Sequence, residues 1–130
     1  MKIEWELPIK TVSEMNCSEH WTAKAKRHKQ QQFFVRLSYK KHVNEIKLPC
    51  SITLTRLASR FLDSDNLPAS MKFLRDELSE CIFPEKGGFY MTKTGKMKAK
   101  KGHGDNDPRV IWLYGQEKSK RQGVRIEIEF

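Results

Sequence analysis

The sequence has few cysteines and no long apolar run, and both absences exclude classes of protein. Its cysteines, three among 130 residues, are widely spaced and form no CxxC pair, which argues against a disulfide framework or a zinc knuckle. No segment approaches the roughly 18 apolar residues of a membrane-spanning helix. The first residues alternate charged and apolar side chains, unlike a signal peptide. We therefore expect free thiols in a cytoplasmic protein.

Several catalytic motifs are also missing. The four histidines fit neither HExxH nor a zinc-ligand spacing, and neither GxGxxG nor a P-loop is present, so no nucleotide cofactor is expected. Ser-His-Asp catalysis has no anchor in the sequence. What the chain does have is a formal net charge of +9. This charge favours an anionic partner, and nucleic acid more than a membrane, because no strongly amphipathic, lysine-flanked helix is found.

Hydrophobic periodicity predicts a single domain over residues 1–130. Its expected elements are a strand, a helix, a strand, a helix and two strands, at about residues 2–7, 18–42, 51–57, 67–78, 110–114 and 123–130. This β-α-β-α-β-β order predicts an α+β fold with a mixed β-sheet and two main helices packed mostly on one face. The strand at 110–114 is expected to be buried.

The two expected helices differ in their apolar residues. The first is basic near its start, and its later aromatic and aliphatic residues are expected to pack on the core: Phe33, Phe34, Leu37 and Tyr39. The second carries a single stripe at positions i, i+4, i+7 and i+11: Leu67, Met71, Leu74 and Leu78. Such a stripe is typical of a helix that packs one face against a core.

Residues 84–107 are polar and rich in glycine and lysine, which favours a long, basic, mobile loop, with a hairpin around Thr94 and Gly95 as the alternative. Lysines here and in the first helix are candidates for phosphate contacts. The predicted DNA-binding residues are Lys24, Lys26, Arg27, Lys29, Arg60, Lys93, Lys96, Lys98, Lys100 and Lys101. The alternative is a solvated charge run with no partner.

The acidic residues of this basic chain gather at two points. Asp63 and Asp65 come just before the second helix, and Asp105 and Asp107 come just before a strand. Carboxylates this close repel unless a cation lies between them, and oxygen ligands select Mg²⁺ or Mn²⁺. A metal-dependent nuclease is the hypothesis that follows. The alternatives are an Asx-turn with a helix cap at the first point and a polar turn before Pro108 at the second.

Lys72 is the basic residue placed to assist these carboxylates. It follows Asp65 by seven residues, nearly two helical turns, so we expect the two side chains to share a helix face. We expect Lys72 to face a phosphate beside the acidic cluster, where it is a catalytic candidate. The alternative is a solvated helical lysine.

The chain resembles the RusA family of Holliday junction resolvases, small dimeric endonucleases of bacteriophages and prophages. The resemblance covers nearly the whole chain and is carried by the DxDNL motif at 63–67, which opens a helix. It is also carried by Asn16 with Glu19-His20-Trp21 before the basic helix, by the acidic 105–107 turn before a strand, and by the closing 123–128 strand.

This resemblance implies a RusA-like fold and a homodimer in the cytoplasm of a bacterial host or phage-infected cell. It implies Mg²⁺-dependent paired nicks in four-way DNA junctions, in recombination and repair. The family's carboxylates fall on Asp63 and Asp65, with a third on Asp107, or on Asp105 as the competing choice.

Two family residues are replaced in this chain. The lysine one turn after the second aspartate is Ala69, with Lys72 the nearest basic residue on that face. The arginine before the motif is Leu62, with Arg60 close by. One rival is therefore a weak or inactive DNA-binding protein on the same scaffold, and another is a basic domain that binds RNA.

Overall fold

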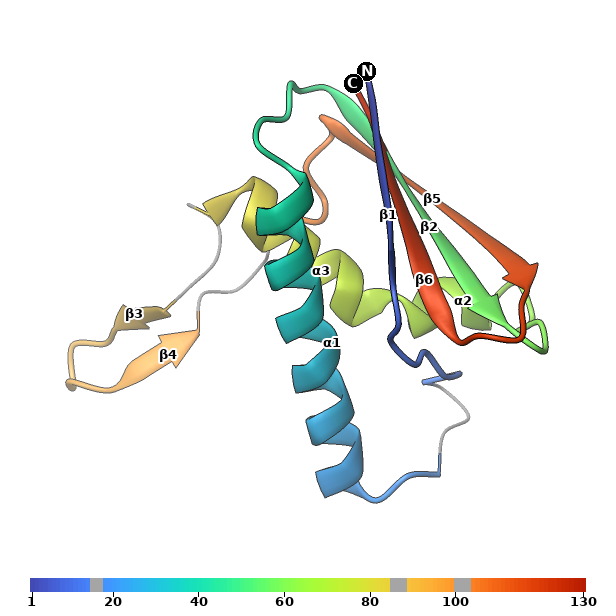
Figure 1. Cartoon of the computed structure of the whole chain (residues 1–130). Coiled ribbons are helices and arrows are strands. Elements are labelled where there is room, and N and C mark those ends of the chain that lie inside the picture. Colours follow the sequence, from blue (N-terminus) through green and yellow to red (C-terminus); the bar gives the residue numbers. More distant parts are fainter. Residues whose placement is uncertain (15–17, 85–88, 100–103) are drawn as a thin grey trace.

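The main sheet is built from four strands whose side chains alternate between its two faces. In the computed structural model, which describes residues 1–14, 18–84, 89–99 and 104–130, the strand order is β1-β6-β2-β5 (Figure 1). The strands are β1 (Lys2–Leu7), β2 (Cys50–Ala58), β5 (Val110–Lys118) and β6 (Gly123–Glu129). Strand β2 pairs parallel with β5, and the other pairs are antiparallel. The sheet is therefore mixed, and the domain is α+β.

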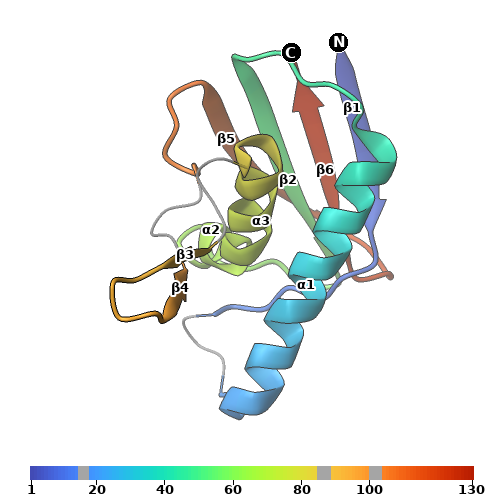
Figure 2. The same ribbon diagram turned by 90° about the vertical axis from the view of Figure 1, so that its left-hand side faces the viewer.

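The core lies between one face of this sheet and the helices. Ile52 lies opposite Ile128 on β6 and Trp112 on β5, and Leu54 continues the same face. Ile52, Leu54 and Ile128 are completely buried. This face is covered by helix α1 (Trp21–His42) and helix α3 (Lys72–Ile82), which pack against each other (Figure 2). In the described part of the chain no helix covers the opposite face.

The second expected helix is divided into two. Helix α2 (Asn66–Ser70) ends at Met71, whose backbone angles of −103° and 2° interrupt the helix before α3 begins. All four residues of the apolar stripe are buried as expected: Leu67, Met71, Leu74 and Leu78. The break therefore leaves the apolar stripe packed on the core. It removes the continuous helix that would have placed Asp65 and Lys72 on one face.

The prediction that the later apolar residues of helix α1 pack on the core is wrong for three of them. Phe33 is 62 % exposed and Leu37 55 %, and Phe34 also lies outward. The buried side of the helix carries a largely polar set instead: Arg27, Gln31, Val35 and Ser38. Its first turn begins later than expected, because His20 rather than Ser18 accepts the capping hydrogen bond, from Thr22 N–H at 3.3 Å.

Two further expectations are corrected outside the helices. Part of residues 84–107 forms a hairpin of β3 (Phe89–Met91) and β4 (Met97–Ala99) that projects from the domain (Figure 1). Gly95 has a φ of 81°, which suits glycine in the hairpin turn. Strand β5 is buried on one side only, because Ile111 is 60 % exposed and Leu113 50 %. Among the described residues, no helix combines the length and apolarity needed to cross a membrane.

Candidate functional site

The Asp63–Asp65 loop follows β2 and leads into α2 at one end of the sheet. Both carboxylates are exposed. The Asp63 carbonyl accepts hydrogen bonds from the N–H groups of Asn66 and Leu67, at 3.0 and 3.1 Å, and so turns the chain into the helix. Asp65 occupies the cap position but makes no side-chain capping bond. Backbone groups therefore start this helix, and the carboxylates are left facing solvent.

Gln116 of β5 holds this loop in place from the neighbouring strand. Its side-chain oxygen accepts from Leu62 N–H at 2.9 Å, and its side-chain nitrogen donates to Leu62 C=O at 2.8 Å. Leu62 precedes Asp63 directly, so the amide fixes the backbone from which the first carboxylate extends. This contact joins residues far apart in the sequence, and no local pattern signals it.

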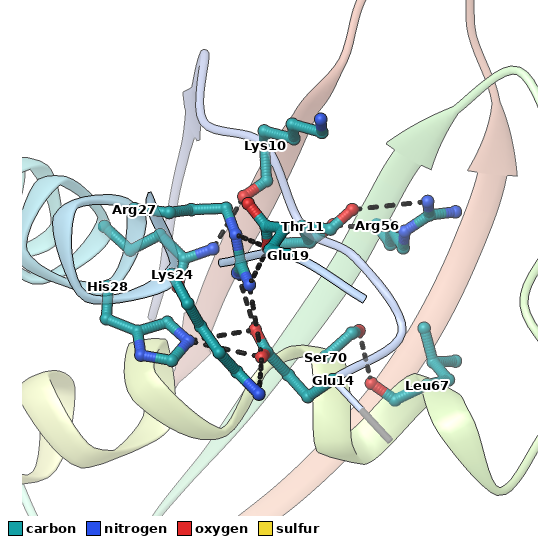
Figure 3. Close-up of polar contacts among 11 residues, drawn as sticks. Lys10, Thr11, Glu14, Glu19, Lys24, Arg27, His28, Arg56, Leu67 and Ser70 are labelled. Atoms are coloured by element: carbon teal, nitrogen blue, oxygen red, sulfur yellow. Dashed lines mark hydrogen bonds and ion pairs between the residues drawn. The ribbon is translucent and has the colours of Figure 1, made fainter. Parts of the chain in front are cut away.

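Arg56 binds the backbone of the same segment, at Arg60. It is buried at the end of β2, donates to Arg60 C=O at 2.7 Å, and donates to the hydroxyl and carbonyl of Thr11 (Figure 3). Burial lowers the pKa of Arg56, but an arginine keeps its charge in proteins. In the described part of the chain its acceptors are neutral oxygens, and one of them is the carbonyl of Arg60, three residues before Asp63.

Two exposed basic residues flank the loop as well. Lys118 at the end of β5 lies 5.6 Å from the ring centre of Phe61, and Arg60 is part of the loop itself. The segment that leads into Asp63 and Asp65 thus carries exposed positive charge of the kind that attracts a phosphate. Arg60 was among the predicted DNA-binding residues, and Lys118 was not.

The structure does not bring the second acidic group to this loop. Asp107 lies just before Val110, the first residue of β5, whereas Leu62 is bound to Gln116, which is six residues after Val110 in the same strand. At the usual rise of a strand this separation is about 20 Å. Among the described residues no group of three or more His, Cys, Asp or Glu side chains could hold a metal ion. The expected convergence of Asp63, Asp65 and Asp107 is therefore not found within one chain.

Asp107 is instead part of a structured turn. Its side chain is 5 % exposed, accepts from Arg109 N–H at 3.0 Å, and forms an ion pair with the Arg109 guanidinium at 2.8 Å. Asp105, the competing choice, lies 3.9 Å from the Arg75 guanidinium. Residues 105–107 therefore form a polar turn before Pro108, which was the alternative to a metal site.

The prediction that Lys72 shares a helix face with Asp65 loses its basis in the structure. That prediction required a continuous helix, and the break at Met71 separates Lys72 from Asp65 and Ala69. The Lys72 ammonium lies 5.7 Å from the ring centre of Phe73, and no ion pair links it to Asp63 or Asp65 among the described contacts.

Arg27, predicted to bind DNA, belongs to a buried ion-pair cluster. It is 8 % exposed, makes a two-point contact with Glu14, and donates to Glu19 at 2.7 and 2.9 Å (Figure 3). His28 and Lys24 also approach the Glu14 carboxylate, at 3.2 and 4.0 Å. Arg27 is therefore a structural residue, and its assignment to DNA binding is not supported.

Burial and ion pairing act in opposite directions on this cluster. Burial alone would raise the pKa of Glu14, but hydrogen bonds from Arg27 and His28 and their charges outweigh it and lower that pKa. Burial would lower the pKa of Arg27, and the hydrogen bonds to Glu14 and Glu19 raise it instead. Both shifts favour the charged forms, as in a satisfied ion pair.

Most of the other predicted DNA-binding residues are exposed. Lys26 and Lys29 lie on the outer side of α1, where Trp21 is 74 % exposed. The exposed lysines of the hairpin are Lys93, Lys96 and Lys98, whereas Lys100 and Lys101 lie outside the described residues. Aromatic rings beside lysines are typical of surfaces that bind unpaired bases and phosphates.

Compared with known proteins, the chain matches no family model, no curated protein and no solved structure. The resemblance to RusA proteins therefore depends on the sequence motifs alone.

Proposed function

We propose that this protein is a Mg²⁺-dependent endodeoxyribonuclease of the RusA type, which nicks branched DNA such as the four-way junction. We further propose that it acts as a homodimer in the cytoplasm of a bacterial or phage-infected cell. The observation that carries this proposal is the Asp63–Asp65 loop, where two exposed carboxylates follow a backbone segment that is bound at Arg60 and at Leu62.

The two carboxylates fit the chemistry of Mg²⁺. This ion is commonly bound through one or two carboxylates together with substrate phosphates, and it keeps several waters. Asp63 and Asp65 would hold it, and they do not require a third carboxylate from the same chain. When bound, Mg²⁺ activates water and stabilises the charge that develops on the phosphate.

The remaining steps belong to the protein's own side chains. Gln116 fixes the backbone before Asp63, so this part of the loop does not have to be ordered when DNA arrives. Arg60 and Lys118 attract the scissile phosphate and offset its charge. Lys26 and Lys29 bind flanking phosphates, and Trp21 stacks on a base left unpaired at the branch.

The direct test is Asp63→Asn, assayed on a synthetic four-way junction with and without Mg²⁺. We expect nicking to fall by about 100-fold or more, the usual effect of removing one group that stabilises the transition state. Glu45→Gln is the matched control, because it removes an exposed carboxylate from the loop after α1. Unchanged nicking by the Asp63→Asn protein would show that the site is elsewhere.

The second candidate function is a non-catalytic DNA-binding protein on this scaffold. It is favoured by the absence of a three-carboxylate group among the described residues and by Ala69 in place of the family lysine. Binding of the junction without nicking, in Mg²⁺ and in Mn²⁺, would establish it. Competition among a junction, a linear duplex and an RNA hairpin would separate both functions from RNA binding.

A further inference from the structure

The hairpin of β3 and β4 forms a two-stranded sheet of its own that projects from the domain (Figure 1 and Figure 2). Its end is held by a compact turn. Thr92 N–H donates to Lys96 C=O at 2.8 Å, and Gly95 N–H donates to Thr92 C=O at 3.0 Å. A lone pair of strands is only marginally stable in water and adds little to the stability of a domain. Contact with another molecule is therefore the role that this shape suits.

The two faces of the hairpin differ in character. Met91 lies opposite Met97, directly behind the turn, so the two methionines share one face. Both are largely exposed, at 68 % and 61 %. The next pair along the strands is Tyr90 opposite Lys98, and the alternation of side chains places it on the other face. The end of the hairpin thus carries an apolar pair on one side and a polar pair on the other.

The charge of the hairpin is of one sign. All charged residues in the stretch 90–98 are lysines, and all of them are exposed: Lys93, Lys96 and Lys98. Such a segment is complementary to a polyanion. The unbranched methionine side chain adapts to irregular apolar surfaces. An apolar pair with lysines around it therefore matches stacked bases that lie between two phosphate backbones.

The apolar pair decides which groove of DNA the hairpin suits. A β-ribbon in the major groove reads base edges through hydrogen bonds, and methionine is at best a weak acceptor. Proteins that bind the minor groove instead insert apolar side chains, methionine among them, between adjacent base pairs and partly unstack them. The face that carries Met91 and Met97 fits the second mode.

We propose that the β3–β4 hairpin enters the minor groove of a duplex arm of the substrate and wedges Met91 and Met97 into a base step. Lys93, Lys96 and Lys98 then contact phosphates on the two sides of the groove. Pyrimidine–purine steps such as TA are favoured, because they unstack most easily. This inference rests on the proposed function in one respect, that DNA is the substrate, and it names the part of the DNA that this segment recognises.

The wedge is tested with the double variant Met91→Gln, Met97→Gln. The substrates are four-way junctions that carry the fluorescent base 2-aminopurine at successive positions within the arms, in EDTA so that nicking does not compete. We expect the wild type to raise the fluorescence at a step within an arm, where unstacking brightens this base, and the double variant to lose that rise. Met91→Leu with Met97→Leu should keep it, because leucine is an apolar wedge of similar size. An unchanged rise in the glutamine variant would overturn the wedge.

Lys93→Gln is the matched control, because it alters the same hairpin without changing the apolar pair. It should lower the slope of log K against log salt by about 1, as the loss of one phosphate contact does, and keep the fluorescence rise at saturating protein. The glutamine double variant should do the reverse. All three side chains are exposed, so these variants should fold as the wild type does. Loss of the rise in Lys93→Gln as well would overturn the assignment of unstacking to the methionines.

The groove is tested by building the arms from A·T, I·C or G·C pairs. An I·C pair presents the major-groove edge of G·C but lacks the guanine amino group in the minor groove, as A·T does. We expect arms of I·C to bind as A·T arms do and more tightly than G·C arms, and the glutamine double variant to lose this preference. If I·C arms bind as G·C arms do, the hairpin does not enter the minor groove and the proposal fails.

Unstacking and nicking can fail separately. If the wild type unstacks an arm in EDTA but never nicks the junction in Mg²⁺, the proposed function fails and the role of the hairpin stands. If it nicks the junction without unstacking an arm, the wedge fails and the nuclease stands. A protein that binds no DNA overturns both.

Discussion

The charged residues of this protein fall into two regions that share a chemistry but differ in their surroundings. Around Arg27, two partly buried carboxylates that precede α1 accept hydrogen bonds from a buried guanidinium. Around Asp63, carboxylates are exposed on a loop that other side chains hold by its backbone. The first region uses charge to join an irregular segment to α1, and the second keeps charge available for a ligand.

This difference shows that a charged residue in the sequence does not by itself indicate a binding surface. Lys26 and Arg27 are neighbours in one helix, yet one is exposed and the other is 8 % exposed. A buried charge with a partner stabilises the fold chiefly because removing the partner is costly. An exposed charge contributes little to stability and remains free to contact DNA. Substitutions that separate stability from binding test this distinction.

The largest effect on stability is expected from Arg27→Gln. The substitution leaves Glu14 and Glu19 without their guanidinium, and breaking a buried pair in this way costs about 3–5 kcal/mol. Glu19 is partly exposed, so we expect the lower end of that range, measured as the free energy of unfolding in urea. Lys26→Gln should change the same quantity by less than about 0.5 kcal/mol. Similar values for the two variants would contradict the comparison.

A smaller loss of stability is expected from Asp107→Asn. The carboxylate of Asp107 stabilises the turn before β5. Loss of the carboxylate that accepts from the Arg109 guanidinium should cost about 1–3 kcal/mol. Asp105→Asn is the matched variant, and its partly exposed, longer contact with Arg75 should cost about 0–1 kcal/mol. Thermal unfolding of both proteins, followed by circular dichroism, ranks them. A larger loss for Asp105→Asn would reverse the assignment.

Much of the fold could be predicted from the sequence because alternation and helical stripes report one buried face at a time. The strands at 2–7, 51–57 and 123–130 were located closely, since each alternates cleanly. The faces of α1 were not predictable in this way. The polar residues on its buried side are accommodated by partners in other segments, such as Glu14 for Arg27 and Lys10 C=O for Gln31.

The candidate site was only partly predictable for a related reason. The sequence indicated two aspartates before a helix, and the structure has them there, with both side chains exposed. It gave no sign of Gln116 or Arg56, whose partners lie 54 and 45 residues away. The expected meeting with Asp107 failed because it depends on the direction of β5 relative to β2, and local patterns do not encode that direction.

Acid should weaken the buried cluster selectively. Because the pKa of Glu14 is lowered in the folded protein, its contribution to stability is fully present above its ordinary value of 4.5. That contribution is lost as the pH falls through the folded pKa, which lies below this value. We therefore expect the stability difference between wild type and Glu14→Gln to shrink from pH 6 toward pH 2.5 in urea titrations. A difference that stays constant with pH would mean that Glu14 stabilises the fold without its charge.

The smallest expected change concerns DNA binding by the outer side of α1. Binding of a four-way junction should weaken as salt rises, because phosphate contacts release counterions. Lys26→Gln should reduce the slope of log K against log salt by about 1, the value for one lost phosphate contact. Arg27→Gln, compared at a temperature where it is folded, should leave the slope unchanged, because its guanidinium is already held by Glu14 and Glu19. If Arg27→Gln lowers the slope as much as Lys26→Gln does, then the ion-pair cluster opens on DNA, and the division between structural and binding charge does not hold in the complex.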